Sequence, residues 1–387
     1  MRFLHPDGTV VHLAYCTNVH PSEDLDGVLR QIRVFGGGVR AALGTDLLGL
    51  GLWLPAPLAR ELAADPAKTD RLREGLAQAG LETVTLNAFP YTGFHAPVVK
   101  HSVYSPDWTE RARLDYTVDC ARVLSRLMPD DAARGSVSTL PLAWREPWGP
   151  ERWERARRHL GELSDVLSDL ASRGRPVRVG LEPEPGCVIE TTRDAARQLA
   201  ARPQHVGVCL DTCHTATEFE DPKASLGLLA DTGLPVVKVQ ASAAVEVPEP
   251  AGPEARAALG AFAEDRFLHQ TRELAGGRKE SRDDLPEALS GPSQLAGRGP
   301  WRTHFHVPLH TPVGAPLCGT TDHLTDTLAL LLGPDGARTD HVEVETYTWS
   351  VLPEGRRPVG EEGLIAGIAA ELGWARDRLL GLGLTPV

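Results

Sequence analysis

Short apolar runs alternate with longer helix-like stretches along most of this chain. Three consecutive runs end at Glu182, Asp211 and Gln240, and these ends are 29 residues apart each time. A strand, a helix and their connections need about thirty residues, so the spacing is typical of successive strand–helix units. We expect strands at residues 12–18, 48–54, 83–89, 136–142, 177–182, 206–211, 235–240 and 341–347.

The stretches between these runs have helical patterns. In the clearest one, residues 151–173, Leu160, Leu163, Leu167 and Leu170 fall on one face. Weaker patterns cover residues 58–79, 109–127, 192–201, 322–332 and 362–380. Eight strands, each followed by a helix, predict an α/β fold of the (β/α)8 TIM-barrel type. A doubly wound open sheet has the same alternation, but no G-x-G-x-x-G motif follows the first run.

One segment does not fit a plain barrel. About a hundred residues separate Gln240 from the last run, and residues 248–300 are rich in Pro, Gly, Ala and charge. Residues 301–310 then predict a further strand with three alternating histidines. This segment either takes the place of the run 235–240 in the barrel or adds a hairpin over the mouth. We favour a single-domain chain, residues 1–387, with residues 248–310 inserted as a lid or side wall.

Charge and composition exclude several classes of protein. The net charge is −12, the acids are spread along the chain, and there is no basic block, which disfavours nucleic-acid binding. No run approaches the ~20 apolar residues that cross a membrane. The first residues do not have the pattern of a signal peptide, in which a basic region precedes an apolar one. The six cysteines form no C-x-x-C pair, so we expect reduced core cysteines. We therefore expect a cytoplasmic protein without membrane insertion.

Acidic residues end three of the expected strands. Glu182, Asp211 and Glu345 would meet at the mouth of a barrel, where strand ends converge. Three close carboxylates repel one another unless they share a proton or a cation. A divalent metal resolves this conflict most simply. The alternative is that each acid caps a helix or pairs with an arginine. Glu184 lies on the same strand face as Glu182 and is a candidate substrate contact.

Histidines could join this site. His214 follows Asp211 by three residues and would serve as a ligand, a substrate clamp or a proton carrier. His304 and His306 share one face of the strand expected at 301–310, and alternate histidines can bind one metal. We prefer His306 as the ligand and His304 as a substrate contact. A half-exposed edge strand is the alternative.

Lys238 shares a strand face with Gln240. A buried lysine is costly without a partner, so we expect it at the mouth as a substrate clamp or electrophile. A Schiff base is an option that nothing in the sequence favours.

Amides and imidazoles follow the first and third expected strands. A small molecule with many hydroxyl groups would be held by such side chains, although ordinary turn chemistry explains them equally well. The candidates for substrate binding are Asn18, His20, Asn87 and His95.

Ten segments together resemble a known family. The succession resembles the xylose-isomerase-like TIM barrels, which include sugar isomerases, ketose epimerases and phosphodiesterases of the endonuclease IV type. More narrowly, it resembles the EboE-like metabolite traffic proteins. The segments are YCTNVHP (15–21), NAFPYTGFH (87–95), VYSPDW (103–108), STLPL (138–142), LEPEPGC (181–187), DTCH (211–214), KVQAS (238–242), RFLHQT (266–271), WRTHFHVPLH (301–310) and VEVETYTW (342–349).

This resemblance implies a metal site at the barrel mouth. The Glu, Asp, His and Glu ligands of the epimerases fall on Glu182, Asp211, Gln240 and Glu345, and His214 matches a substrate-contacting histidine. Gln240 departs from the pattern, so either His306 completes the site or the metal is harder or absent. The resemblance also implies a place in a secondary-metabolite biosynthesis or export operon, with its other proteins as possible partners.

The resulting hypothesis is a metal-dependent isomerase or epimerase of a sugar or cyclitol-like metabolite. A divalent Zn, Mn or Mg ion would polarise a substrate oxygen, and Glu182 or Glu345 would take the neighbouring proton. His214 and Lys238 would hold substrate oxygens. One alternative is a phosphoester hydrolase with two or three metals, which His95, His304 and His306 slightly favour. Another is a non-catalytic metabolite-binding barrel.

Overall fold

Eight parallel strands form a closed barrel. A computed structural model describes residues 1–199 and 203–387 of the chain. The last strand pairs with both its predecessor and the first barrel strand, which closes the ring. Each expected run overlaps one strand, so the TIM-barrel prediction is confirmed. The strands are β2 (Val10–Cys16), β3 (Leu48–Trp53), β4 (Leu81–Ala88), β5 (Gly135–Thr139), β6 (Val177–Leu181), β7 (Val206–Asp211), β8 (Val236–Ala241) and β14 (His341–Val344).

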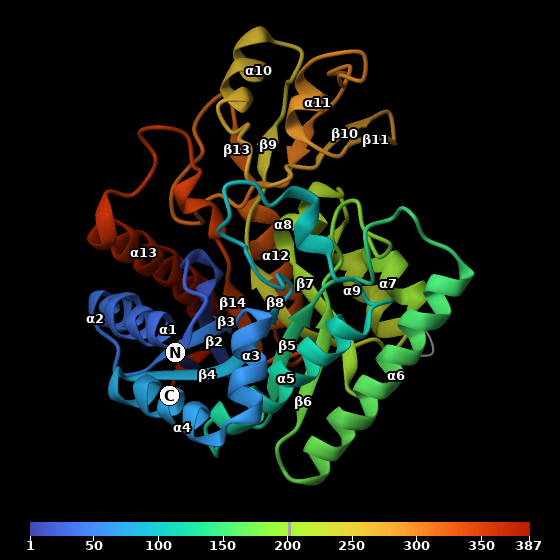
Figure 1. Cartoon of the computed structure of the whole chain (residues 1–387). Helices are drawn as coiled ribbons and strands as arrows, with labels where there is room; N and C mark the ends of the chain where they lie inside the picture. The colour runs from blue at the N-terminus through green and yellow to red at the C-terminus, as the bar shows by residue number, and fades with distance from the viewer. Residues whose placement is uncertain (200–202) are drawn as a thin grey trace.

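Helices surround the barrel (Figure 1). The pattern at 151–173 becomes α6, whose Leu160, Leu163 and Leu167 are buried against the core. The pattern at 58–79 is two helices, because Asp65 caps a new helix that starts at Pro66. The helix expected at 192–201 ends at Gln198, and residues 200 and 201 lie outside the described part. The elements are η1 (Thr17–Val19), α1 (Leu25–Gln31), η2 (Ile32–Gly36), α2 (Gly37–Leu43), α3 (Ala56–Ala64), α4 (Pro66–Gln78), η3 (Lys100–Tyr104), α5 (Arg111–Leu127), α6 (Pro150–Ser172), α7 (Thr192–Gln198), α8 (Thr212–Thr217), α9 (Pro222–Asp231), α12 (Thr321–Leu331), η4 (Tyr347–Ser350) and α13 (Gly360–Gly381).

The chain termini meet at the end of the barrel away from the insertion. Strand β1 (Arg2–Leu4) pairs antiparallel with β2 and with β15 (Thr385–Pro386), and Figure 1 shows the two ends close together. Within the part of the chain that the structure describes, no helix is long and apolar enough to cross a membrane.

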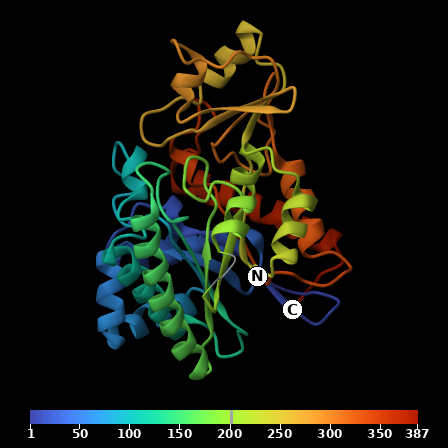
Figure 2. The same ribbon diagram turned by 90° about the vertical axis from the view of Figure 1, so that its right-hand side faces the viewer.

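The inserted segment builds a second sheet above one end of the barrel (Figures 1 and 2). Its five antiparallel strands have the order β11-β10-β12-β9-β13. The sheet reaches from Val245 to Gly319, and is therefore wider than the expected 248–310. Because β8 pairs with β7 and β14, the insertion does not replace a barrel strand. Its elements are β9 (Val245–Val247), α10 (Pro253–Gly260), β10 (Thr271–Ala275), β11 (Arg278–Arg282), α11 (Leu285–Leu289), β12 (Trp301–Thr303) and β13 (Cys318–Gly319).

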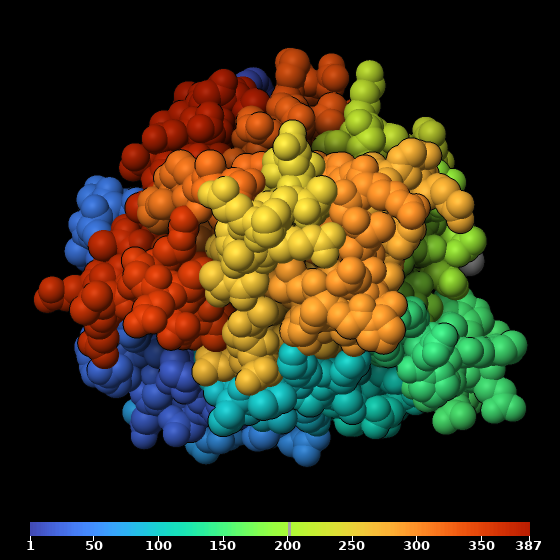
Figure 3. All heavy atoms as spheres, turned by 90° about the horizontal axis from the view of Figure 1, so that it is seen from above, coloured from blue at the N-terminus to red at the C-terminus, as the bar shows by residue number. Residues whose placement is uncertain are grey.

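The strand expected at 301–310 is mostly wrong. Only Trp301–Thr303 forms a strand, paired with β9 and β10, and the chain from His304 to His310 is irregular. Pro308 cannot donate a ladder hydrogen bond, which is one reason why the strand does not continue. Seen from above, the insertion covers the centre of this face of the molecule (Figure 3).

Buried ion pairs fasten the insertion to the barrel loops. Arg272 on β10 is 1% exposed and donates to Glu218, which follows α8, and to Glu190, which precedes α7. Lys279 on β11 also pairs with Glu218. These contacts join the hairpin β10–β11 to two barrel loops at once. The insertion is therefore held against the barrel by charge as well as by its chain connections.

The barrel interior is polar. Lys238 on β8 forms a fully buried ion pair with Glu343 on β14. A side chain at Gly51 on β3 would lie 1.3 Å from Glu343 Oε1, so glycine there makes room for this pair. Burial alone would lower the pKa of Lys238, but the contact with Glu343 raises it above its ordinary value. The pair therefore places a positive charge below the strand ends.

Candidate metal centre

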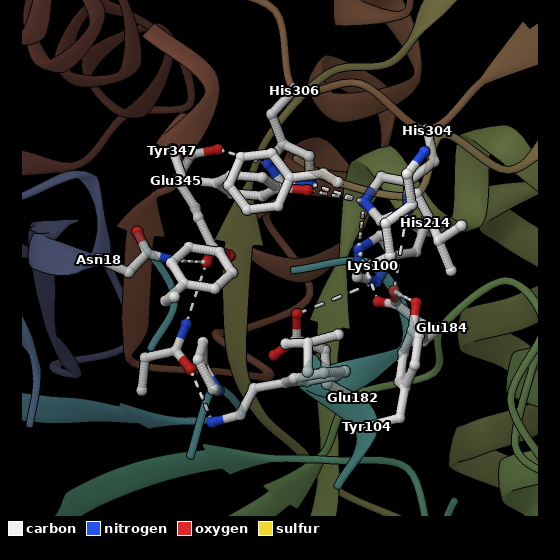
Figure 4. A pocket seen from close by; sticks show the side chains of 17 residues that line it. Asn18, Lys100, Tyr104, Glu182, Glu184, His214, His304, His306, Glu345 and Tyr347 are labelled. Atoms are coloured by element: carbon white, nitrogen blue, oxygen red, sulfur yellow. Dashed lines mark hydrogen bonds and ion pairs between the residues drawn. The ribbon is translucent and has the colours of Figure 1, made fainter. Parts of the chain in front are cut away.

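Three carboxylates converge where β6, β7 and β14 end. Glu182, Asp211 and Glu345 each offer an oxygen, and these oxygens lie within 4.8 Å of one another. All three side chains are at most 4% exposed. The structure therefore brings together the three acids expected at the mouth, and Figure 4 shows Glu182 and Glu345 facing the same space.

Each of these acids has one oxygen that no described protein group satisfies. The atoms are Glu182 Oε2, Asp211 Oδ2 and Glu345 Oε2. The other oxygen of Asp211 accepts from the Cys213 and His214 amides and from the Ser242 hydroxyl. Buried carboxylate oxygens normally have partners, and a divalent cation binds such oxygens. The donor set therefore fits a metal ion.

Burial and mutual repulsion change the protonation of this cluster. Burial raises the pKa of Glu182 well above its ordinary value, and the carboxylates of Glu345 and Asp211 raise it further. Burial also raises the pKa of Glu345 well above its ordinary value, and the Asp211 carboxylate adds to this shift. The Lys238 charge partly opposes both shifts. Without a cation the cluster therefore holds protons, whereas a bound cation favours the ionised form.

Gln240 stands at the fourth strand end. It is fully buried, it pairs in register with Asp211, and it lies on the same strand face as Lys238. Among the described residues, neither the side-chain oxygen Oε1 of Gln240 nor its side-chain nitrogen Nε2 has a hydrogen-bond partner. A buried amide without partners costs free energy, so its position in the barrel interior fits an oxygen ligand for the same cation.

Two asparagines fix Glu345. The amide nitrogens of Asn18 and Asn87 donate to its Oε1 at 2.6 and 3.0 Å. His95 in turn bonds the main-chain oxygen of Asn18 at 2.8 Å through Nε2. Asn18 and Asn87 line the pocket, whereas His95 stands behind Asn18. His95 thus positions a pocket residue instead of facing the cavity.

Three histidines meet beside the carboxylates (Figure 4). The Nε2 atoms of His214 and His304 are 3.1 Å apart, and those of His304 and His306 are 3.3 Å apart. Each Nδ1 faces an oxygen acceptor: Pro183 O, Gln270 Oε1 and Glu345 O. Each Nδ1 therefore carries a proton, and the three Nε2 atoms point toward one another.

Burial keeps two of these rings neutral. Burial and the neighbouring imidazoles lower the pKa of His304 well below its ordinary value. Burial also lowers the pKa of His306 to about 4. Glu184 Oε2 lies 3.2 Å from His214 Nε2, so a carboxylate lies beside the three Nε2 atoms. This arrangement fits a second cation, with nitrogen donors that suit zinc.

A pocket connects both groups to the surface. It contains Glu182, Glu184, the three histidines and Glu345, and part of its wall is aromatic. Asp211 and Gln240 lie deeper and are not part of the pocket wall. The pocket residues that the sequence reasoning missed are Phe89, Pro90, Phe94, Lys100, Val103, Tyr104, Phe267, Leu268 and Tyr347.

Tyr104 illustrates how the missed residues act. Its hydroxyl donates to Glu184 at 2.9 Å and accepts from the Gln270 amide at the same distance. Tyr104 and Tyr347 both lie in segments that carry the family resemblance, 103–108 and 342–349. Membership in these segments could have singled out the two tyrosines, but it did not indicate what their side chains do.

Besides His95, two expected site residues lie away from the pocket. Lys238 does not reach the pocket, because Glu343 holds its ammonium group inside the barrel. His20 is 1% exposed and lies behind the barrel, where it stacks on Phe35 at 4.3 Å and contacts the Tyr15 hydroxyl. The structure therefore does not bring these two side chains to the pocket wall. His310, the third histidine of its segment, packs near Trp349 outside the site.

Comparisons with known proteins give a consistent fold. The family model described as "Xylose isomerase-like TIM barrel" matches residues 40–266. No curated protein is similar enough to count as a match. A xylose isomerase domain protein from Planctomyces limnophilus is similar at TM-score 0.51 and 12% identity, covering 96% of this chain and 97% of its own.

A second solved structure is the IolI protein with a bound zinc atom. It has a TM-score of 0.50 and 13% identity, and the similarity covers 96% of this chain and 99% of that one. These identities show the fold alone. The family model spans more than half of the chain, and this chain therefore belongs to the xylose isomerase-like TIM barrel family.

Proposed function

We propose that the chain is a metal-dependent isomerase or epimerase that acts on a sugar or cyclitol-like metabolite. The observation that carries this proposal is the meeting of three buried carboxylate oxygens without described protein partners beside a pocket. IolI, which shares the fold, binds a zinc atom. The EboE-like resemblance adds the proposal of a role in secondary-metabolite biosynthesis or export, with proteins of the same operon as partners.

Glu182, Asp211 and Glu345 would hold the metal, with Gln240 as an oxygen donor from β8. This set of carboxylate and amide oxygens suits a hard ion such as Mg²⁺ or Mn²⁺. When bound, such an ion supplies Lewis acidity for a carbonyl or hydroxyl oxygen of the substrate. His306 lies 3.8 Å from Asp211 Oδ2 and is the alternative fourth ligand.

Glu182 would move the proton next to the carbonyl. The two asparagine amides tie Glu345 in place, whereas no described group donates to Glu182 Oε2. A carboxylate without fixed donors is freer to turn toward a substrate carbon. His214 and Glu184 would hold substrate hydroxyl groups. Lys238 would act from below, as a buried charge that favours ionised carboxylates.

The test is the exchange of substrate hydrogen with D₂O, followed by NMR over a panel of ketoses and hydroxyketones. With Mn²⁺ present, the wild-type protein should catalyse exchange at the carbon next to the carbonyl. Glu182→Gln should lower the rate on the order of a hundredfold or more, because a positioned base contributes that much. Glu345→Gln should also weaken metal binding.

A matched control is Glu220→Gln. This carboxylate follows α8, accepts from the Thr192 amide at the start of α7, and lies outside the pocket. It should exchange hydrogen at the wild-type rate. Full exchange by Glu345→Gln or Glu182→Gln contradicts the proposed chemistry.

A second candidate is hydrolysis of a phosphoester with two metals. The convergent histidine nitrogens favour it, because they would add a nitrogen-rich cation site next to the carboxylate site. The two functions differ in metal count and reaction. Two ions per chain and cleavage of bis-p-nitrophenyl phosphate support hydrolysis, whereas one ion and D₂O exchange support isomerisation. Ligand binding with neither reaction points to a binding protein.

A further inference from the structure

Part of the pocket wall is a cluster of aromatic rings. Phe94, Phe267 and Tyr347 pack against one another, with ring centroids 4.9 to 5.3 Å apart. They come from three distant segments: the loop after β4, the insertion, and the start of η4. Three segments thus converge to build one apolar surface, and packed rings of this kind are rigid.

Polar groups on this side are already engaged within the protein. The Tyr104 hydroxyl donates to Glu184, and the Lys100 ammonium pairs with Asp284 of the insertion. Lys100 is the only lysine or arginine among the described residues that line the pocket. A phosphate in this pocket would therefore face the carboxylates of Glu182, Glu184 and Glu345 without a free lysine or arginine, which is unfavourable.

The cavity is also narrow. Its cavity volume is about 50 Å³. A free hexose carries hydroxyl groups around its whole rim. Those that face the phenylalanines would lose their hydrogen bonds to water. A flat or slender molecule with oxygens at one end avoids this cost.

We propose that the substrate is a neutral amphipathic α-hydroxyketone or polyol that carries an apolar ring or chain. Its oxygens face the carboxylates and histidines, and its apolar body lies against Phe94 and Phe267. This inference rests on the proposed function for the orientation of the oxygen-bearing end. The insertion then selects substrates, because Phe267 and Leu268 belong to it.

The experiment compares three probes with one common head group by titration calorimetry on the full chain with Mn²⁺. The probes are α-hydroxyacetophenone, hydroxyacetone and dihydroxyacetone phosphate. The phenyl probe should bind about tenfold tighter than hydroxyacetone or better, because its ring is buried against the aromatic wall. The phosphate probe should bind no tighter than hydroxyacetone.

Variants assign the preference to the wall. Phe267→Ala should lose most of the phenyl preference and keep the Kd for hydroxyacetone, and Phe267→Leu should retain part of it. Phe219→Ala is the control, because that ring stacks on Arg302 outside the pocket and should leave the preference unchanged. Circular dichroism establishes that each variant is folded.

The outcomes separate this inference from the proposed function. Glu182→Gln should abolish D₂O exchange while keeping the phenyl preference, and the preference should persist in metal-free protein. Tighter binding of the phosphate probe contradicts the inference, as does a full phenyl preference in folded Phe267→Ala. Failure of all three probes to bind the metal-loaded protein also contradicts it.

Discussion

At Glu345, two asparagine amides hold one carboxylate oxygen and leave the other free. At Gln240, by contrast, both polar atoms of a fully buried amide lack partners among the described residues. The difference matters because a ligand that is fixed in advance loses little entropy on binding. Glu345 is therefore positioned for one role, whereas in the proposed metal site Gln240 would set the kind of metal that is preferred.

Replacing Gln240 tests its role. Gln240→His should raise the affinity for Zn²⁺ relative to Mg²⁺ by about tenfold or more, because an imidazole nitrogen is a better ligand for zinc than an amide oxygen. Competition against a chromogenic chelator measures both affinities. Gln240→Leu, the matched control, should weaken binding of both metals. If wild type, Gln240→His and Gln240→Leu all have the same affinity for Zn²⁺ and the same affinity for Mg²⁺, the fourth ligand is another residue. His306 is then the first residue to test.

Residue identity alone predicted part of this site. Glu182, Asp211 and Glu345 could be found because each ends an apolar run, and strand ends of a barrel converge. Lys238 follows the same logic but lies lower on its strand, where Glu343 neutralises it. This ion-pair partner of Lys238 could not be predicted. It depends on the register between β8 and β14, and strand register cannot be read from the sequence.

At the scale of elements, the insertion is attached through charge. Arg272 and Lys279 on the hairpin β10–β11 share Glu218, a carboxylate with no exposed side-chain surface. Removing one member of a buried ion network leaves an uncompensated charge, which costs far more than the loss of a surface pair. The hairpin should therefore act as a fixed wall.

Arg272→Met should destabilise the protein by roughly 3–5 kcal/mol and make the insertion sensitive to proteolysis. Chemical denaturation and limited proteolysis measure the two effects. Arg30→Ala is the control, since its pair with Glu361 is about half exposed and should cost less than about 1 kcal/mol. The double variant Arg272→Met/Glu218→Gln should recover part of the loss. Equal effects of Arg272→Met and Arg30→Ala would contradict this view of the attachment.

The barrel strands were predictable and the strands inside the insertion were not, for a physical reason. Barrel strands are buried on both faces and appear as apolar runs, as in residues 48–54. Strand β11, in contrast, is the charged segment Arg278–Arg282 with mostly exposed side chains, and β12 has three residues. Such strands form through pairing with distant partners, which local sequence does not encode. His304 and His306 still reach the pocket, although they are not on a strand.

At the scale of the whole molecule, one buried acid links the closing helix to the site loops. Glu371 on α13 accepts from the Leu309 amide and the Thr346 hydroxyl. Burial raises its pKa to about 8, although these donors oppose the shift. The folded protein therefore keeps a proton on Glu371 at a pH where the unfolded chain has released it.

The free energy of unfolding should consequently depend on pH through Glu371. The contribution of this carboxyl group to the free energy of unfolding is fully present below pH ~4.5, its pKa in the unfolded chain. The contribution is lost as the pH rises toward 8, its pKa in the folded protein. Relative to Glu371→Gln, the wild-type protein should lose a few kcal/mol over this range, at most about 5. Denaturant unfolding at several pH values measures the difference. The surface variant Glu354→Gln should show none, and a flat difference for Glu371→Gln would contradict the argument.

The insertion carries two kinds of side chain within one continuous stretch. His304 and His306 belong to the reactive end of the pocket, and Phe267 and Leu268 belong to its apolar wall. The stretch from Val245 to Gly319 starts on β9 and ends on β13, which pair with each other, so both ends of the stretch lie side by side. A change confined to this one stretch would therefore alter the histidines and the apolar wall of the pocket together, while the eight strands of the barrel stay as they are.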